Sequence, residues 1–297
     1  MLGASLRFVN EIGHTRGMRA GFLRTAPARL ALELVALVAA GIVIGLALGP
    51  LPAAARPALG MLVGVPALVA LYVLLVHKLE RRQVTELGGA RAARELGAGL
   101  VLGAGLFAAT IGIIALLGGY VVTGAASPWA LLPPVTMAVT SGVTEELIAR
   151  GVVFRILEEW LGTWAALAIS AALFGLAHRA NPHATWASAA GIAAEAGLLL
   201  AAAYMLTRRL WLAIGLHAAW NWTQAAVFGV AVSGAEIHGW LRGELRGPDW
   251  LSGGAFGPEA SVVAVAVGGT AALVLLARAV RAHGIVPRRP SQRGAYS

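Results

Sequence analysis

The chain has 297 residues, of which 58% are hydrophobic and only 12% charged, a balance that excludes an ordinary soluble domain and predicts an integral membrane protein. Cysteine is absent, which excludes disulfides, thiolate metal sites and a cysteine nucleophile. The formal charge of +9 does not indicate nucleic-acid binding, because the arginines stand between apolar runs or near the chain ends without an aromatic-interleaved basic face.

The first part of the chain predicts a basic segment and three membrane spans. Residues 1–29 carry five arginines among few apolar positions, which is typical of a segment on the cytoplasmic membrane surface. Glu33 and His77 stand at the ends of the first two spans, where we expect snorkelling or solvation. The charged stretch 78–95 is expected to be a cytoplasmic loop. The three spans are predicted over 30–49, 58–77 and 97–122.

The rest of the chain predicts further spans and one long loop. Pro133 and Pro134 fit the first turn of a fourth helix, because the N–H groups there have no intrahelical partner. This helix runs to about Trp160, longer than a bilayer crossing needs, so we expect its end to emerge into water. Residues 233–258 are expected to form the longest extramembrane loop and residues 281–297 a basic, disordered tail. The later spans are predicted over 164–178, 186–207, 210–232 and 259–280.

These spans define an all-α fold, a polytopic membrane helix bundle over residues 30–280 with about eight transmembrane helices. Lys and Arg are concentrated in the segments that flank one side of the predicted spans, which also includes both termini. Because basic loops stay on the cytoplasmic side, we expect both termini in the cytoplasm, with the bundle in the plasma membrane.

Two adjacent carboxylates, Glu145 and Glu146, lie inside the fourth predicted helix. An ionised side chain that enters a bilayer loses its hydration and needs protein partners, so such a pair predicts a functional site. Only Glu146 has an arginine four residues on, Arg150, in the favourable order of acid before base. Glu145 has no such partner in its own helix. A carboxylate without a neutralising partner is suited to act as a general base on water.

Polar residues of two other helices are predicted to meet Glu145. Glu145 and His178 lie equally far from the turn near residues 161–162, so two antiparallel helices with a rise of about 1.5 Å per residue bring them to one depth. His217 and Asn221 are four residues apart and share a helix face. Each alone is compatible with a structural role in the core, but together they predict one buried polar pocket.

Glu195, in the sixth predicted helix, is a further acid inside an apolar run. A carboxylate at that depth either pairs with a structural partner or belongs to a site. The sequence leaves both roles open.

In chain order these residues form three short motifs: EExxxR at 145–150, FxxxH at 174–178 and HxxxN at 217–221. The trio resembles the CAAX prenyl protease and bacteriocin-processing family, also called CPBP or Abi, whose members are membrane-embedded endopeptidases. The resemblance covers about residues 129–225, which we expect to form the catalytic core.

The resemblance implies hydrolysis of a peptide bond inside the membrane. Glu145 with His178 would activate a water molecule, while His217 and Asn221 would stabilise the oxyanion of the tetrahedral intermediate. The substrate would be a membrane-associated peptide or protein, and the sequence does not identify it as prenylated. The residues expected to support this site structurally are Glu146, Arg150 and Phe174.

A zinc-dependent mechanism is an alternative, since Glu145, His178 and His217 could supply three zinc ligands with one open position. We favour a mechanism that requires no cofactor, because Asn221 is a poor zinc ligand and a good oxyanion donor. The HExxH pattern of many zinc proteases is also absent.

A function from another class is a non-enzymatic membrane scaffold or a proton-coupled carrier. Glu33, Glu195 and the acids around Glu145 would then act as relay groups. No internal repeat of helices supports a carrier.

Overall fold

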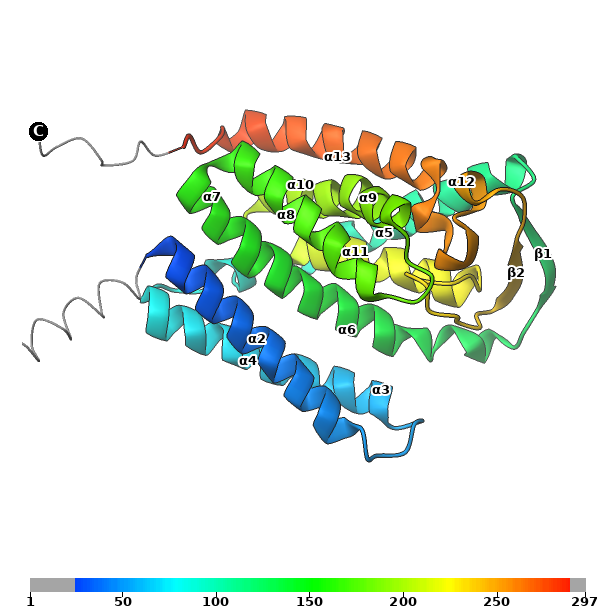
Figure 1. The fold of residues 1–297 in the computed structure, drawn as a ribbon, viewed down its shortest axis with the longest axis horizontal. Coiled ribbons are helices and arrows are strands. Elements are labelled where there is room, and N and C mark those ends of the chain that lie inside the picture. The colour runs from blue at the N-terminus through cyan, green and yellow to red at the C-terminus, as the bar shows by residue number, and fades with distance from the viewer. Residues whose placement is uncertain (1–24, 289–297) are drawn as a thin grey trace, which may run out of the picture.

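The computed structural model describes residues 25–288 and is mostly helical (Figure 1). The predictions for residues 1–24 and 289–297, within the basic N-terminal segment and the basic tail, lie outside the described residues. Within 25–288, five helices are long and apolar enough to cross a membrane, so the count of about eight is not confirmed. These five are α2 (Ala26–Leu48), the run Arg56–Glu80 that contains α3 (Arg56–Leu59) and α4 (Val65–Leu75), α5 (Ala92–Leu116), the run Trp186–Thr207 formed by α9 (Trp186–Ile192) and α10 (Leu198–Thr207), and α13 (Val262–His283).

The other predicted spans are helical, but they lack the length or the apolar composition that a membrane-crossing helix needs. The fourth consists of α6 (Pro134–Glu146), the π-helical segment η5 (Leu147–Phe154) and α7 (Arg155–Leu161), with charged residues along its length. α8 (Thr163–Ala177) has 15 residues, and α11 (Trp211–Trp222) has 12 before it continues as the π-helical η8 (Thr223–Val227). α11 is buried along nearly its whole length, which makes it the central helix of the bundle.

Glycines let α5 and α11 approach closely, as small residues do in membrane helices. A Cβ atom added to Gly99 would lie 2.8 Å from the backbone nitrogen of Leu216, and one on Gly103 would lie 2.9 Å from the Leu216 carbonyl carbon. Gly215 of α11 makes the corresponding close contact with the backbone of α5. Gly105 of α5 takes no part in this contact, since a Cβ atom there would meet nothing within 4 Å.

The third span ends earlier than predicted, because the chain leaves the helix at Leu116. The strand β1 (Tyr120–Ala125) follows and pairs antiparallel with β2 (Leu241–Leu245), which lies inside the predicted long loop 233–258 (Figure 1). The same loop holds the short helix α12 (Asp249–Ser252). This region is therefore ordered, and the prediction of helix through Val122 is wrong.

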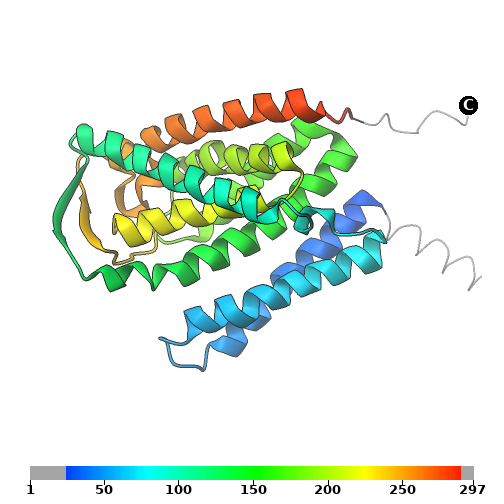
Figure 2. The ribbon, with the colours of Figure 1, turned by 180° about the vertical axis from the view of Figure 1, so that it is seen from behind.

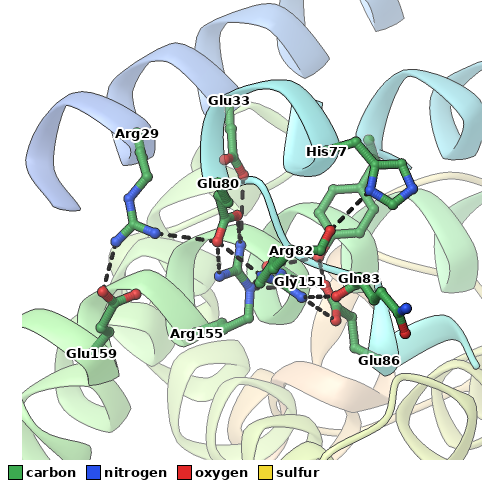
Figure 3. Close-up of polar contacts among 11 residues, drawn as sticks. Arg29, Glu33, His77, Glu80, Arg82, Gln83, Glu86, Gly151, Arg155 and Glu159 are labelled. Atoms are coloured by element: carbon green, nitrogen blue, oxygen red, sulfur yellow. Dashed lines mark hydrogen bonds and ion pairs between the residues drawn. The ribbon is translucent and has the colours of Figure 1, made fainter. Parts of the chain in front are cut away.

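The predicted solvated loop and helix ends around residues 78–95 form a buried ion-pair cluster instead (Figure 3). Both terminal nitrogens of Arg155 donate to the Glu80 carboxylate, at 2.7 and 2.5 Å. Arg82 makes two bonds of 2.8 and 2.7 Å to Glu86, which also accepts from the Tyr72 hydroxyl. Burial raises the pKa of the Glu86 carboxyl, but these hydrogen bonds outweigh it and leave that pKa below its ordinary value.

Of three expectations about exposure in this part of the molecule, two are wrong and one is confirmed. Glu33 is fully buried, with a carboxylate oxygen 3.6 Å from Arg155, so it neither snorkels nor meets water. At the end of the fourth predicted helix, Glu158 is buried and accepts from Thr163 at 2.8 Å, whereas Glu159 is 43% exposed. His77 is exposed, as predicted.

The first residues of the predicted tail are also ordered. α13 continues through His283, and Val286 pairs with Thr163 through two hydrogen bonds of 3.0 and 2.8 Å. A Cβ atom on Gly162, whose φ is +84°, would lie 2.8 Å from both the Val286 carbonyl oxygen and the Arg288 nitrogen. This segment therefore closes over the turn between α7 and α8.

Candidate active site

The two adjacent acids stand where the helix changes type. α6 ends at Glu146, and the chain continues directly into the π-helical η5. Such wide turns inside helices occur frequently at functional sites. The Glu145 side chain is 36% exposed and that of Glu146 is fully buried. One carboxylate thus lies at a cavity and the other lies in the protein interior.

Glu146 is held by the arginine that the sequence predicts as its partner. The Nη1 atom of Arg150 donates to Glu146 Oε1 at 2.8 Å, and Nη2 donates to the backbone carbonyls of Ala196 and Gly197 at 3.2 and 3.0 Å. The guanidinium carbon also lies 4.5 Å from the centre of the Phe174 ring. Because a buried charge is costly without partners on every side, this set of contacts fixes η5 against α8 and η7 (Ala193–Gly197).

The hydrogen bonds of the two histidines define which ring nitrogen carries a proton. His178 Nδ1 lies 2.8 Å from the carbonyl oxygen of Phe174, which can only accept, so Nδ1 is the donor. His217 Nδ1 lies 2.9 Å from Glu146 Oε1 and donates to it in the same way. In the neutral form of each ring, Nε2 is therefore left with a free lone pair.

Both Nε2 atoms face Glu145. The Oε2 atom of Glu145 lies 3.8 Å from His178 Nε2 and 4.0 Å from His217 Nε2. That oxygen is buried and has no hydrogen-bond partner among the described residues. Polar atoms at such separations commonly share a bridging water. The structure thus brings together residues of α6, the end of α8 and α11, at the common depth expected from the hairpin.

Asn221 joins the pocket through a residue that sequence reasoning missed. Its Nδ2 atom donates to Ser141 Oγ at 3.0 Å. Ser141 lies four residues before Glu145 on α6, and this spacing is the signal that could have identified it. One amide hydrogen of Asn221 remains available for the small cavity described below.

A cavity of about 420 Å³ reaches Glu145 and His178 from between α2 and α8. Its remaining walls are largely apolar and include Leu34 and Val38 of α2 and Leu173 of α8. The site is therefore accessible from the side of the bundle.

A second cavity, of about 30 Å³, lies on the inner side of the histidines, with room for about one water molecule. Glu195 lines it together with His178, His217 and Asn221. A Cβ atom added to Gly268 of α13 would lie 2.5 Å from Glu195 Cγ. α13 therefore leaves room for this acid, which borders the site.

Glu259 is a second acid at this inner cavity that sequence reasoning missed. It was predicted as the first residue of the last span, but it lies in a short turn before α13 and is buried. Its Oε1 atom accepts from the backbone nitrogen and the hydroxyl of Ser233, at 2.5 and 2.6 Å. Burial raises the pKa of Glu259 above its ordinary value despite these bonds.

The side chains proposed as zinc ligands are Glu145, His178 and His217. Within residues 25–288, no group of three or more His, Cys, Asp or Glu residues is arranged to hold a metal ion. The three facing atoms are nevertheless of types that zinc binds, and both rings donate from Nδ1 to an oxygen, as zinc-bound histidines do.

Residues 127–223 match the model of a protein family described as type II CAAX prenyl endopeptidase, Rce1-like. No curated protein and no solved structure matches the chain. The matched segment includes every motif residue from Glu145 to Asn221, and it confirms the resemblance to the CPBP family. Together with the apolar helices, this match indicates an integral membrane protein that contains a segment similar to a family of endopeptidases.

Proposed function

We propose that this protein hydrolyses a peptide bond within the membrane, with Glu145 as the general base, since residues 127–223 match the Rce1-like family model. The observation that carries the proposal is the unbonded Oε2 atom of Glu145, which faces the Nε2 atoms of His178 and His217 at 3.8 and 4.0 Å. A base that lacks a partner but borders a cavity can take a proton from water.

In this mechanism a water molecule between Glu145 and His178 attacks the carbonyl carbon of the scissile bond. Its proton passes to Glu145, and the carbonyl oxygen becomes an oxyanion. Donors aimed at this oxygen stabilise it: the free amide hydrogen of Asn221 and, when the ring is protonated, Nε2 of His217. Glu146 accepts from the other nitrogen of His217 and favours that charged ring. Glu145 then gives its proton to the leaving amine as the bond breaks.

We propose that the substrate enters sideways from the bilayer, through the cavity between α2 and α8. Leu34, Val38 and Leu173 make its walls apolar up to Glu145. Such walls suit a lipid-modified or membrane-embedded peptide, and the family description makes a prenylated C-terminal peptide the first substrate to test. The distribution of Lys and Arg supports cytoplasmic termini, and we propose the plasma membrane as the location.

A zinc-dependent form of the same reaction is favoured by one observation, the Nδ1 hydrogen bonds that orient both histidines. Glu145, His178 and His217 would then hold the ion, which supplies a Lewis acid and an activated water. Elemental analysis of purified protein, with activity measured before and after chelation, separates the two forms. We expect full activity in protein shown to lack zinc, and loss of activity that zinc alone restores would favour the metal.

The experiment that tests the proposal compares wild-type protein with Glu145→Gln and Glu236→Gln in liposomes. Glu236 is an exposed acid of the long loop and serves as the matched control. The substrates are a CAAX peptide with and without its prenyl group. Loss of the base should lower turnover by about 10²-fold or more, and the control should cleave like wild type. Equal turnover in Glu145→Gln would refute the role of Glu145, and no cleavage by wild type would favour a carrier or scaffold.

A further inference from the structure

A large groove lies between α5 and α13, on the face of the bundle seen in Figure 2 and distinct from the cavity between α2 and α8. It has a volume of about 820 Å³. Its floor is formed by Leu206 of α10 and Leu212 of α11, and its sides by Val101 and Leu102 of α5 and Leu275 of α13. Val101 is 76% exposed, so no other part of the described chain covers this groove.

The mouth of the groove is strongly basic. Arg91, Arg94 and Arg278 line it, and none of the three forms an ion pair within residues 25–288. The acid at the mouth, Glu95, is already bound by Arg209, whose Nε atom donates at 2.8 Å. Three guanidinium groups are therefore left without a counter-charge beside an apolar channel.

The location of this basic group corresponds to a membrane surface. α5 begins and α13 ends at the end of the bundle where α2 also begins (Figures 1 and 2). The apolar part of the groove extends from this end along helices that are long enough to cross a bilayer. A ligand that fits must therefore carry negative charge at one end and a long apolar chain at the other.

We propose that the groove between α5 and α13 binds an anionic phospholipid. Arg91, Arg94 and Arg278 hold its phosphate, and one acyl chain lies against Val101 and Leu275. Guanidinium groups bind phosphate oxygens through charge-assisted hydrogen bonds. Each basic residue at a membrane surface contributes about 1 kcal/mol of attraction to anionic lipid. A zwitterionic lipid carries its own cation and lacks this net attraction.

A second copy of the chain fits this groove less well. Two copies inserted in one membrane with the same orientation would hold their arginines at the same depth. A symmetric contact over α5 and α13 would then bring two sets of unpaired positive charges together. The lipid, in contrast, supplies the missing negative charge.

Lipid binding here would act on the catalytic region through packing. Leu212, on the groove floor, belongs to α11, the helix that also carries His217 and Asn221. A lipid held between α5 and α13 fills the space beside α11, and we expect it to raise the melting temperature of the purified protein.

The first test removes the charges. Delipidated protein in detergent is titrated with phosphatidylglycerol, phosphatidylcholine or inorganic phosphate, and binding is followed by native mass spectrometry and by thermal unfolding. The variant is Arg91→Gln/Arg94→Gln/Arg278→Gln, and the control is Arg56→Gln/Arg242→Gln/Arg246→Gln, three exposed arginines in α3, in β2 and just after β2. Phosphatidylglycerol should bind wild type and control and raise their melting temperature, and its affinity should fall roughly 100-fold in the variant.

The second test fills the apolar channel and leaves the arginines in place. Gly97 lines the groove, and a Cβ atom there would meet nothing within 4 Å, so Gly97→Leu places its side chain toward open space in the groove. It also replaces glycine by a good helix former, so the variant should fold. We expect it to lose phosphatidylglycerol while its circular dichroism spectrum stays that of wild type.

Several results would overturn the proposal. Equal binding of phosphatidylcholine, equal loss in the control variant, or unchanged binding in both groove variants would each exclude a specific anionic-lipid site. Binding of inorganic phosphate alone would show an anion site without a role for the acyl chain. A dimer in light scattering that dissociates in Gly97→Leu would assign the groove to a second copy instead.

Discussion

Two buried clusters of charged residues differ in whether their carboxylates are satisfied. At the end of the bundle where α2 begins, Glu80 accepts hydrogen bonds from Arg29, Arg82 and Arg155 (Figure 3). In the candidate active site, Glu146 accepts from one arginine and one histidine, and the Oε2 atom of Glu145 accepts from no described residue. The first cluster is typical of structural ion pairing, and the second leaves a polar atom free for chemistry.

Glu33 shows that an unbonded carboxylate alone does not define a site. Neither of its oxygens has a hydrogen-bond partner among residues 25–288, but it is fully buried beside Arg155 and lines none of the cavities described above. Glu145 differs because a cavity of about 420 Å³ reaches it. Access to a cavity, together with the free oxygen, separates the candidate catalytic acid from a structural one.

The strongest test of this difference is the loss of catalysis in the second cluster. Single substitutions Glu145→Gln and His178→Ala should each lower turnover by about 10²-fold or more, since both contact the proposed attacking water. The double variant should lose little more than either single one, because members of one catalytic unit fail together. Single-turnover cleavage in liposomes measures this, with Glu236→Gln, in the exposed long loop, as the control. Multiplicative losses in the double variant would contradict a shared water.

The comparison is sharpened by removing one arginine from each cluster. Among the residues that the structure describes, Arg150 is the one arginine that pairs with Glu146, so Arg150→Ala leaves this buried carboxylate with His217 as its remaining described partner and should cost about 3–5 kcal/mol of unfolding free energy. Arg29→Ala leaves Glu80 with two arginines, and its other partner, Glu159, is 43% exposed, so this substitution should cost less, about 1.5–3 kcal/mol.

Denaturant unfolding in detergent measures both arginine variants. The double variant Glu146→Ala/Arg150→Ala should recover part of the stability, because neither charge is then unpaired. An equal or larger loss of stability in Arg29→Ala would show that the number of partners of a buried carboxylate does not determine the cost of removing one.

The smallest effect concerns pH and Glu86. Its folded pKa lies below its ordinary value, so the unfolded chain binds more protons at this position when the solution is acidic. The stabilisation from the ionised carboxylate is therefore complete above the unfolded pKa of about 4.3 and is lost as the pH falls through the lower, folded pKa. Thermal unfolding of wild type and Glu86→Gln between about pH 7 and pH 3 should show a difference that shrinks on acidification. If the difference in melting temperature between wild type and Glu86→Gln stayed constant over this pH range, Glu86 would not contribute to the pH dependence of stability.

The features that could be predicted from the sequence depend on local spacing. The pairing of Glu146 with Arg150 follows from a separation of four residues, and the common depth of Glu145 and His178 follows from a short turn between two helices. Both statements need only the geometry of one helix or one hairpin.

The features that could not be predicted are contacts between distant segments. Glu259 joins the site through the long loop, where it accepts from Ser233, and Arg155 meets Glu80 across 75 positions in the chain. The strands β1 and β2 could not be predicted either. The sequence of β1 continues the apolar run of the preceding helix, and its hydrophobic pattern does not change from helical to strand periodicity. A hydropathy argument assumes that each charged residue is solvated. The ion-pair partner of a buried charged residue becomes visible only in the folded structure.

The pairing of Val286 with Thr163 has a consequence for how the protein is made. The turn between α7 and α8 aligns Glu145 with His178, and two of its hydrogen bonds come from a residue beyond α13. Within the described residues, a ribosome synthesises Val286 only after all five helices that could cross a membrane, so these two hydrogen bonds can form only after those helices are made. Until then, the alignment of Glu145 with His178 depends on the contacts of the hairpin alone.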